Sequence, residues 1–426
     1  MHQTSLMDGY VFIITYHNHL VDKAVSTMAK ELQKELQLAE QVKVNLKSQE
    51  PYALGAALLA AGIYWWLQGH GPGLGEAWLF GLAFGFVLQR SRFCFVAAFR
   101  DPFITGNTSV SRAVVIALAA ATPGMALVAW RGVTLADVHP AGWHTLAGGL
   151  LFGMGMVLAG GCASGNLMRV GEGHLLQWLV LGAFIGGSLW GAHDFGWWHQ
   201  VSICRSPTLF LPKVLGWGPA LVIQLLALGL IYLGLRYLEN RSFPGSTPAW
   251  RPRQPFRLRY LWSRPWPYWT GGLALAVLDV ALIWRGGQPW GITTAFSYWG
   301  AWLWKAFTGA PPGWYYYSLP AHSRALSLGF LAEPRTLLDL GLIGGAFLAA
   351  LAASEFRLHW PRRWPLVPAA LTGGLLMGYG ARIAMGCNIG ALFNGIASFS
   401  LHGWLFGLGL AGGAYLGSKL LLRFLV

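Results

Sequence analysis

Two glycine-rich stretches decide the fold of this chain: GGLLFGMGMVLAGGCASGNL at residues 148–167 and GGLLMGYGARIAMGCNIGAL at residues 373–392. Aligned without a gap, they are identical at 11 of 20 positions, and both contain the pattern Gly-Cys-x-x-Gly. Each stretch is long and apolar enough to lie in a membrane, and its glycines allow close packing against other helices. A repeat of this kind predicts a chain built from two related halves.

The composition of the whole chain agrees with a membrane protein. Of its 426 residues, 55% are hydrophobic and 11% are charged, whereas about 25% of residues are charged in an ordinary soluble domain. Charge this sparse excludes a cytosolic enzyme, a disordered chain and a coiled coil. Long apolar stretches without alternation of period two also disfavour an outer-membrane barrel. The sequence therefore predicts an all-α polytopic membrane protein.

The charge balance is strongly basic. The chain has 30 lysines and arginines against 16 acidic residues, a formal net charge of +14. We assign most of this surplus to the positive-inside bias of membrane proteins and the remainder to attraction of an anionic substrate. Four cysteines are too few for a disulfide framework, and the polar first 50 residues do not resemble a cleavable signal peptide.

Apolar segments divide the chain into spans and connections. Ten spans are expected, at 52–68, 76–93, 109–130, 141–161, 175–192, 218–238, 267–286, 337–353, 364–386 and 401–424. Residues 290–308 are apolar but short, and 309–336 is a loop rich in proline, tyrosine and arginine. Residues 1–51 form an amphipathic extension with a coiled-coil-like helix at 20–50, which is either a partner-binding or membrane-surface helix or dispensable.

Three basic segments predict the topology. They are the linker 239–266, the loop that contains Arg357, and the turn that contains Arg90 and Arg92. If all three are cytoplasmic, an even number of membrane crossings must join the linker to the loop that contains Arg357. Spans 267–286 and 337–353 supply two crossings. The segment 290–308 must therefore enter and leave the membrane on one side, as a re-entrant segment. The same parity places the amino-terminal helix inside.

The parity also orients the two repeats. Span 141–161 should run inward and span 364–386 outward, so the repeats are inverted. Two membrane units of five spans follow, 52–193 and 218–425, separated by an external loop at 194–217, and the second unit contains the cytoplasmic linker. Inverted repeats with short re-entrant half-helices are typical of transporters and channels, with the substrate path at the repeat interface.

Three cysteines stand where helices are expected to break: Cys94, Cys162 and Cys387. The glycines beside the last two are Gly161, Gly165, Gly386 and Gly390. Backbone freed inside a membrane is tolerated where it lines a path, and a helix that starts after a break presents N–H groups to an anion. A neutral thiol can hold a polarizable sulfur anion without trapping it. Close packing is the alternative role for any single cysteine, but three at breaks favour a substrate path.

Charged and polar residues add further candidates. Arg92 and Arg382 are placed to draw an anion toward the path, although each could equally be salt-bridged or face a lipid phosphate. Asn388 stands directly after Cys387 and is expected to line the path. Asp279 lies inside a span, where it could pair with Arg285 or Arg382 or bind a proton.

Methionines near the cysteines suggest an alternative, conduction of the soft metal Cu(I). The basic balance and the scarcity of acidic residues in the spans oppose it. His193, Asp194 and His199 are better explained as a wet loop than as metal ligands. We therefore expect no metal site and no cofactor, and neither a nucleotide-binding loop, a catalytic triad spacing nor a nucleic-acid partner is indicated.

Three blocks of the chain are similar to the signature blocks of the YeeE/YedE family of bacterial inner-membrane sulfur transport proteins. They are QRSRFCFVAAFRD (89–101), GGLLFGMGMVLAGGCASG (148–165) and GYGARIAMGCNIGALFNGIASFSLHGWLF (378–406). The resemblance covers residues 76–425. It implies an hourglass-shaped helical protein with inverted halves, in which Cys94, Cys162 and Cys387 pass thiosulfate by S–H contacts. The imported sulfur would feed cysteine synthesis.

The chain departs from the compact members of that family. The amino-terminal extension, the basic linker and the 309–336 segment are similar to the longer, selenium-linked YedE-type members. The resemblance therefore implies a sulfur or selenium oxyanion without fixing which.

The sequence predicts a multi-pass permease of the bacterial inner membrane that imports a small sulfur-containing anion, thiosulfate first. One alternative is a selenium-compound transporter of the same family. The other is a membrane-embedded sulfur-relay enzyme, in which a persulfidated cysteine hands sulfur to a cytoplasmic carrier protein.

Overall fold

The computed structural model describes residues 48–133, 135, 138–242, 259–361, 364 and 366–425. The chain divides into two units, Met1–Gln49 and Glu50–Val426, and the second is compact in its described residues. The helix predicted at 20–50 falls almost entirely on residues outside the described part, as does most of the basic linker. The second unit is helical, and its described residues hold no β-strand beyond two isolated bridges.

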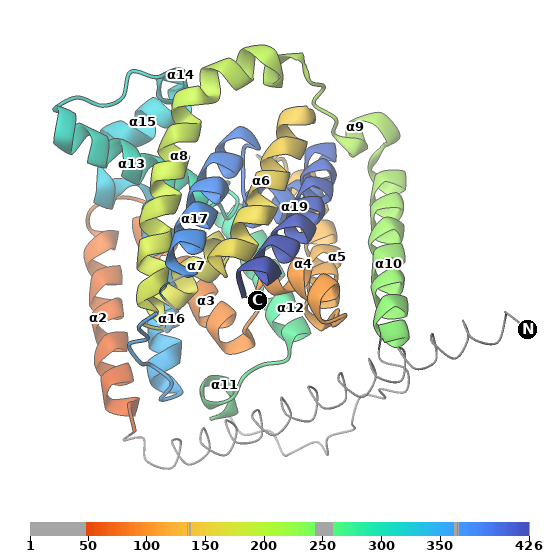
Figure 1. The fold of residues 1–426 in the computed structure, drawn as a ribbon. Coiled ribbons are helices and arrows are strands. Elements are labelled where there is room, and N and C mark those ends of the chain that lie inside the picture. The colour runs from red at the N-terminus through yellow and green to blue at the C-terminus, as the bar shows by residue number, and fades with distance from the viewer. Residues whose placement is uncertain are drawn as a thin grey trace, which may run out of the picture. The chain divides into compact units, whose positions relative to one another are not determined.

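Figure 1 shows the helices of the second unit, with α13–α15 toward the end at which α8 finishes and α11 at the opposite end. In chain order they are α2 (Glu50–Gln68), α3 (Leu74–Ser91), α4 (Phe95–Ile104), α5 (Ser109–Trp130), α6 (Trp143–Ala159), α7 (Ala163–Gly171), α8 (Leu175–Val201), η1 (Ile203–Arg205), α9 (Leu211–Leu215), α10 (Trp217–Ser242), α11 (Tyr260–Ser263), α12 (Tyr268–Gly286), α13 (Thr293–Thr308), α14 (Tyr315–Ser318), α15 (Pro320–Leu328), η2 (Phe330–Ala332), α16 (Pro334–Ala352), α17 (Leu366–Ile383), η3 (Asn388–Asn394), α18 (Gly395–Ala397) and α19 (Leu401–Leu425).

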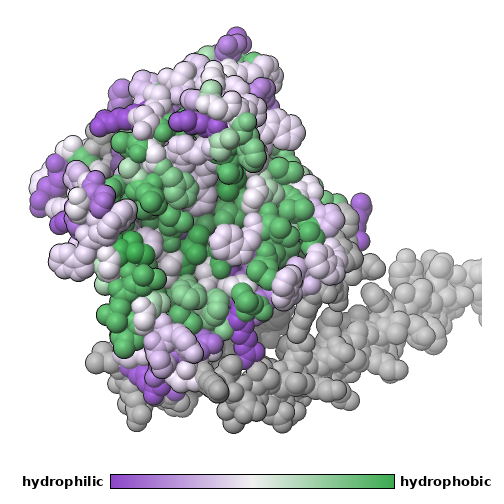
Figure 2. Space-filling model, turned by 90° about the vertical axis from the view of Figure 1, so that its left-hand side faces the viewer, coloured by the Kyte–Doolittle hydropathy of each residue, from purple (hydrophilic) through white to green (hydrophobic). Residues whose placement is uncertain are grey.

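Eight helical stretches of the described residues are long and apolar enough to cross a membrane. They are α3 with α4, α5, α6 with α7, α8 with η1, α10, α12, α16 and α19. Every predicted span coincides with a helix, but α2 and α17 fall outside these eight. Figure 2 shows hydrophobic side chains across the middle of one face and hydrophilic ones toward its ends. The predicted class, an all-α polytopic membrane protein, is confirmed.

Glycines bring the central helices α6 and α17 into backbone contact. A Cβ atom on Gly148 would lie 2.6 Å from the carbonyl oxygen of Gly380, and one on Gly373 would lie 2.5 Å from that of Gly155. No side chain fits at these distances. Because Gly148 aligns with Gly373, and Gly155 with Gly380, the two contacts exchange when the repeats are exchanged.

Other helix pairs show the same exchange. α3 packs against α16, and the pair that corresponds to it when the repeats are exchanged, α12 and α5, also packs together. α6 packs against α19, and the corresponding pair, α17 and α8, does the same. The α3–α16 contact is again made by glycines, since a Cβ on Gly81 would lie 2.2 Å from the carbonyl oxygen of Leu338. The helices are thus held by backbone-to-backbone packing, which small residues allow in membranes.

One segment differs in detail from the sequence expectation, and a second was expected to be re-entrant. α8 continues to Val201, so residues 194–201, expected at the start of an external loop, are helical, and His193, Asp194 and His199 lie on that helix. In the segment 290–308, Trp290 and Thr293 are buried, and the helix α13 then runs to Thr308, which is exposed. That this segment enters and leaves the membrane on one side stays a prediction.

Candidate functional site

The three cysteines singled out by the sequence occupy the same local position. Cys94, Cys162 and Cys387 are the residues immediately before the short helices α4, α7 and η3, and each has an extended backbone conformation. The structure therefore places every one of them at a break between two helical segments. All three are free thiols; Cys162 and Cys387 are buried and Cys94 is half-buried.

The breaks share a second feature that the sequence did not reveal. The residue two positions before each cysteine has a left-handed backbone: Arg92 with φ of 52°, Gly160 with 69° and Met385 with 58°. Glycine adopts this conformation freely, whereas a residue with a side chain pays about 1–3 kcal/mol. Such strain collects at functional sites, because the surrounding structure must hold it in place.

The sulfurs of Cys94 and Cys162 lie on either side of Gly165. A Cβ atom on Gly165 would lie 3.5 Å from Cys162 Sγ and 3.8 Å from Cys94 Sγ. The Gly165 amide donates to Cys162 Sγ at 3.5 Å, and the Ser164 hydroxyl lies 3.4 Å from the same sulfur. Cys94 and Cys387 both lie close enough to Cys162 that a charge on either thiol would act on the Cys162 thiol, so the three cysteines lie in one region of the structure.

The Cys387 thiol lies between two helix starts. It contacts the amides of Ile389 and Gly390 in η3, and both the hydroxyl and the amide of Thr293 at the start of α13. The neighbouring Asn388 is buried and donates to Met156 Sδ at 3.4 Å. The amide and hydroxyl groups beside this thiol are hydrogen-bond donors, and donors of this kind favour a neighbouring negative charge.

The four predicted glycines are not equivalent. A Cβ on Gly386 would lie 2.6 Å from the amide nitrogen of Ala391, and one on Gly161 would lie 3.2 Å from Gln177 Oε1. A Cβ on Gly390, in contrast, would meet no atom within 4 Å. Packing explains Gly386 and contact with the thiols explains Gly165, whereas there is open space beside Gly390.

Arg382 is buried near Cys387. Its guanidinium donates to the carbonyl oxygen of Thr293 at 3.0 Å, to Ser297 Oγ at 3.5 Å and to the Tyr316 hydroxyl. A cavity of about 620 Å³ is lined by Arg382, by Met385 and by residues of α13, α15 and the start of α16. Met385 is two residues before Cys387, so this cavity borders the helix break that carries the third thiol.

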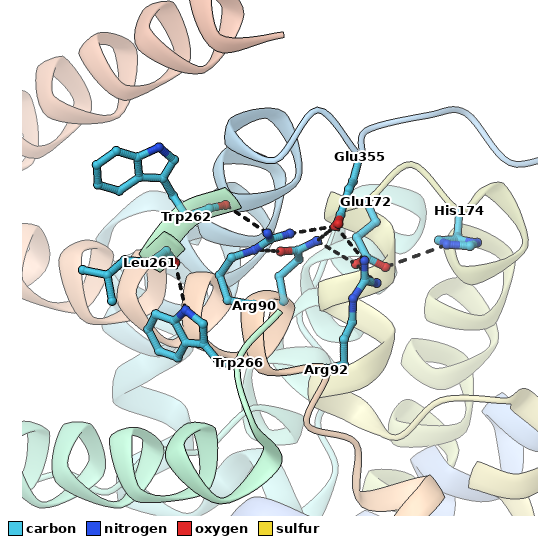
Figure 3. A network of polar contacts seen from close by, with 9 residues as sticks. Arg90, Arg92, Glu172, His174, Leu261, Trp262, Trp266 and Glu355 are labelled. Carbon is cyan, nitrogen blue, oxygen red and sulfur yellow. Dashed lines mark hydrogen bonds and ion pairs between the residues drawn. The ribbon is translucent and has the colours of Figure 1, made fainter. Parts of the chain in front are cut away.

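Arg92, two residues before Cys94, lies in an ion-pair network (Figure 3). It donates to Glu172 Oε1 at 2.6 Å and to Glu355 Oε2 at 2.8 Å, while Arg90 donates to the same Glu355 oxygen at 2.7 Å. Burial acts to raise the pKa of Glu355, but the charges of Arg90 and Arg92 outweigh it and the pKa is lowered. The sequence left three roles open for Arg92: attracting an anion, forming a salt bridge or facing a lipid phosphate. In the structure Arg92 forms salt bridges.

The partners offered for Asp279 are engaged elsewhere. Arg285 pairs with Glu76, and Arg382 has the neutral partners described above. Asp279 Oδ1 instead accepts a hydrogen bond from the Trp290 amide at 3.1 Å, which fixes the turn between α12 and α13.

Sequence reasoning missed several buried polar groups. Glu172 is buried and Glu355 is half-buried, and both form ion pairs; the scarcity of acidic residues, 16 in 426, was a usable signal for them. Asp339 in α16 is also fully buried, and neither of its carboxylate oxygens has a hydrogen-bond partner within the described residues.

Comparison with known proteins identifies the family of this chain. Residues 90–416 match the model of a family described as sulphur transport. The chain is 31% identical over 354 residues to the thiosulfate transporter TsuA of Spirochaeta thermophila, covering 77% of this chain and 92% of that protein. The thiosulfate transporter TsuA of Escherichia coli is 27% identical over 76% of this chain and 88% of its own length.

A further relative matches a shorter part. The probable transporter YedE of Salmonella typhimurium is 36% identical over 151 residues, which is 34% of this chain and 36% of that protein. Both breaks of the glycine-rich repeat and the turn that carries Cys94 lie within the family match. This chain is a helical membrane protein with free thiols at broken helices. Because it matches the family model over most of its length, it belongs to the sulphur transport family and is a transporter rather than an enzyme.

Proposed function

We propose that this protein is an inner-membrane permease that imports thiosulfate, passed along a path lined by Cys94, Cys162 and Cys387. The observation that carries the proposal is the convergence of three free thiols at three helix breaks of one geometry. The names of the two TsuA relatives support thiosulfate as the ion.

The chemistry of the path suits an ion that must leave as readily as it enters. A neutral thiol donates weakly, and the helix starts beside the cysteines add amide donors, each helix terminus acting as roughly half a positive charge. The ion would pass from the cavity beside Arg382 to Cys387, and then between Cys162 and Cys94. The route would be lined by main-chain atoms and small side chains of Gly161, Gly165, Gly386, Gly390 and Asn388.

The route would run at the interface of two inverted repeats, 52–193 and 218–425. The exchanged glycine contacts of α6 and α17, and the exchanged pairs α3–α16 and α5–α12, support this relation. Arg92, Glu172 and Glu355 would close the path on the cytoplasmic side, because Arg90, which shares Glu355 with Arg92, donates to the Trp262 carbonyl in α11, within the basic linker.

The test is uptake of labelled thiosulfate by bacterial cells that lack their own sulfate and thiosulfate importers. Cys→Ser at positions 94, 162 and 387 should leave partial uptake, since a hydroxyl still donates, and Cys→Ala should abolish it. Cys204→Ala is the matched control, because Cys204 is exposed and donates to the Gln200 carbonyl. Uptake by Cys387→Ala equal to that of Cys204→Ala would overturn the proposal.

Two other results would change the proposed substrate or the proposed mechanism. Uptake of a selenium oxyanion in preference to thiosulfate would make the protein a selenium-compound transporter. Inactive Cys→Ser variants, together with a persulfide on Cys162 or Cys387 in the mass spectrum, would indicate that sulfur is handed to a cytoplasmic carrier protein.

A further inference from the structure

The two long helices of the glycine-rich repeat end just before the cysteines. Ala159 is the last residue of α6 and stands three residues before Cys162. Ala384 directly follows α17 and stands three residues before Cys387. The last carbonyl oxygens of a helix have no amide of the same helix to accept from. Because a membrane offers no water in its place, each break needs a hydrogen-bond donor from elsewhere in the chain.

One side chain in each half supplies that donor. Gln177, near the start of α8, donates from Nε2 to the carbonyl oxygen of Ala159 at 3.3 Å. His402, near the start of α19, has its Nε2 at 2.7 Å from the carbonyl oxygen of Ala384. A carbonyl oxygen only accepts, so His402 is the donor and its ring proton is on Nε2. Both side chains are buried, with exposed fractions of 4% for Gln177 and 0% for His402.

The two hydrogen bonds are equivalent in the repeat. When the ungapped alignment of the two glycine-rich stretches is continued along the chain, Ala159 aligns with Ala384, and Gln177 aligns with His402. Helices α8 and α19 begin within one residue of each other in that alignment. The glutamine amide nitrogen and the histidine Nε2 are separated from Cα by the same number of bonds. Two different side chains can therefore reach the same carbonyl.

The neighbours of each donor explain why the two side chains differ. Gln177 Oε1 accepts a hydrogen bond from Asn166 Nδ2 at 2.9 Å, so the glutamine also joins the end of α6 to α7. The residue aligned with Asn166 in the second half is Ala391, which has no side-chain donor. In agreement, His402 Nδ1 has no hydrogen-bond partner within the described residues. The first half uses a donor and an acceptor, and the second half uses a donor alone.

We propose that Gln177 and His402 are positioning residues, which fix the helix breaks that carry Cys162 and Cys387 respectively. Each donor ties the end of a long helix, α6 or α17, to the helix that follows the break, α8 or α19. The cysteine lies between these two attachment points, so its sulfur is held in place relative to both. Loss of the donor frees the break and leaves the thiol chemically intact. The consequence for transport rests on the proposed function, whereas the control of the breaks does not.

Thiol reactivity tests the breaks without transport. The purified protein is treated with N-ethylmaleimide, and the labelling rate of each cysteine is followed by mass spectrometry of its peptides. A buried thiol reacts slowly, and a freed one reacts faster. Asparagine has the same amide on a shorter side chain that does not reach the carbonyl. His402→Asn should raise the labelling rate of Cys387 at least fivefold and that of Cys162 less than twofold, and Gln177→Asn should do the reverse.

The matched control is His402→Gln, which places a donor at the reach used by the other half of the repeat. It should label at the wild-type rate. In the thiosulfate uptake assay, His402→Asn should lower the saturating rate at least tenfold, whereas His402→Gln should keep it within threefold of the wild type. This rescue identifies the Nε2 donor as the group that acts, because glutamine has neither an ionisable ring nor an Nδ1.

Four results are decisive against one proposal or the other. Unchanged labelling in both asparagine variants would overturn the positioning role, as would equal uptake by His402→Asn and His402→Gln. A parallel rise at Cys162 and Cys387 in both asparagine variants would show a general loss of packing and would also overturn it. A local rise in labelling, in a protein that does not transport thiosulfate, would instead contradict the proposed function alone.

Discussion

Arg92 and Glu172 form an ion pair of 2.6 Å that joins the ends of two segments carrying cysteines. Arg92 lies two residues before Cys94, and Glu172 follows α7, the helix that begins after Cys162. Any movement that separates these two thiols on this side must therefore stretch or break the pair. Glu355 binds the same arginine from the loop after α16, so three distant parts of the chain meet there.

Removing a carboxylate from this network should destabilise the protein. Arg90 is 1% exposed and its partner Glu355 is 30% exposed, so Glu355→Gln should cost about 1–3 kcal/mol by leaving a buried cation poorly paired. Thermal unfolding of the purified protein measures this effect. Glu50→Gln, which removes an exposed pair with Arg259, is the control and should cost under about 1 kcal/mol. Equal costs for the two variants would contradict the prediction.

The two glycines that occupy equivalent places in the repeat should respond differently to a methyl group. Gly165→Ala adds a Cβ at ordinary contact distance from two sulfurs, so the protein should fold but transport poorly. Gly390→Ala adds a Cβ that meets no atom within 4 Å. Thiosulfate uptake per folded molecule should fall at least fivefold for the first variant and less than twofold for the second. The reverse order would remove Gly165 from the path.

The left-handed residues before the cysteines make a prediction about backbone strain. Gly160→Ala should destabilise by about 1–2 kcal/mol, because a Cβ is unfavourable at this φ. Met385→Gly should relieve strain of the same kind, which offsets part of the packing lost with the methionine side chain. The melting temperatures of the two variants and of Met385→Ala separate these effects: Met385→Gly should be more stable than Met385→Ala. A less stable glycine variant would show that the φ of 58° carries no strain.

The buried imidazole of His322 predicts a dependence of stability on pH. Its pKa is lowered to about 3 in the folded protein, against about 6.5 in an unfolded chain. Between these values the unfolded state binds the additional proton, so the contribution of His322 to stability falls as the pH falls below about 6.5. Melting curves from pH 7.5 to pH 5 should therefore show a shallower decline for His322→Gln than for the wild type. An unchanged decline would mean that His322 is not buried as a neutral ring.

The sequence was sufficient for the features that depend on local pattern. The breaks at Cys162 and Cys387 follow from glycines within apolar helices, and each helical span follows from apolar length. The salt bridge of Arg92 could not be predicted, because Glu172 and Glu355 lie 80 and 263 residues away. The left-handed φ of Met385 has no local signal either, since methionine rarely adopts it. The cavity beside Arg382 depends on how the segment 309–336 folds back over α13, which composition alone does not specify.

The contact of Gly148 with Gly380 and of Gly155 with Gly373 bears on how an ion can cross this protein. Contacts made mainly by glycine backbone leave few side chains that could rearrange to a second stable packing, so α6 and α17 should stay fixed relative to each other. Large rocking motions of microseconds to milliseconds are then not required for passage. Throughput would be set by rotations of thiol and guanidinium side chains, and the protein would conduct as a narrow pore does.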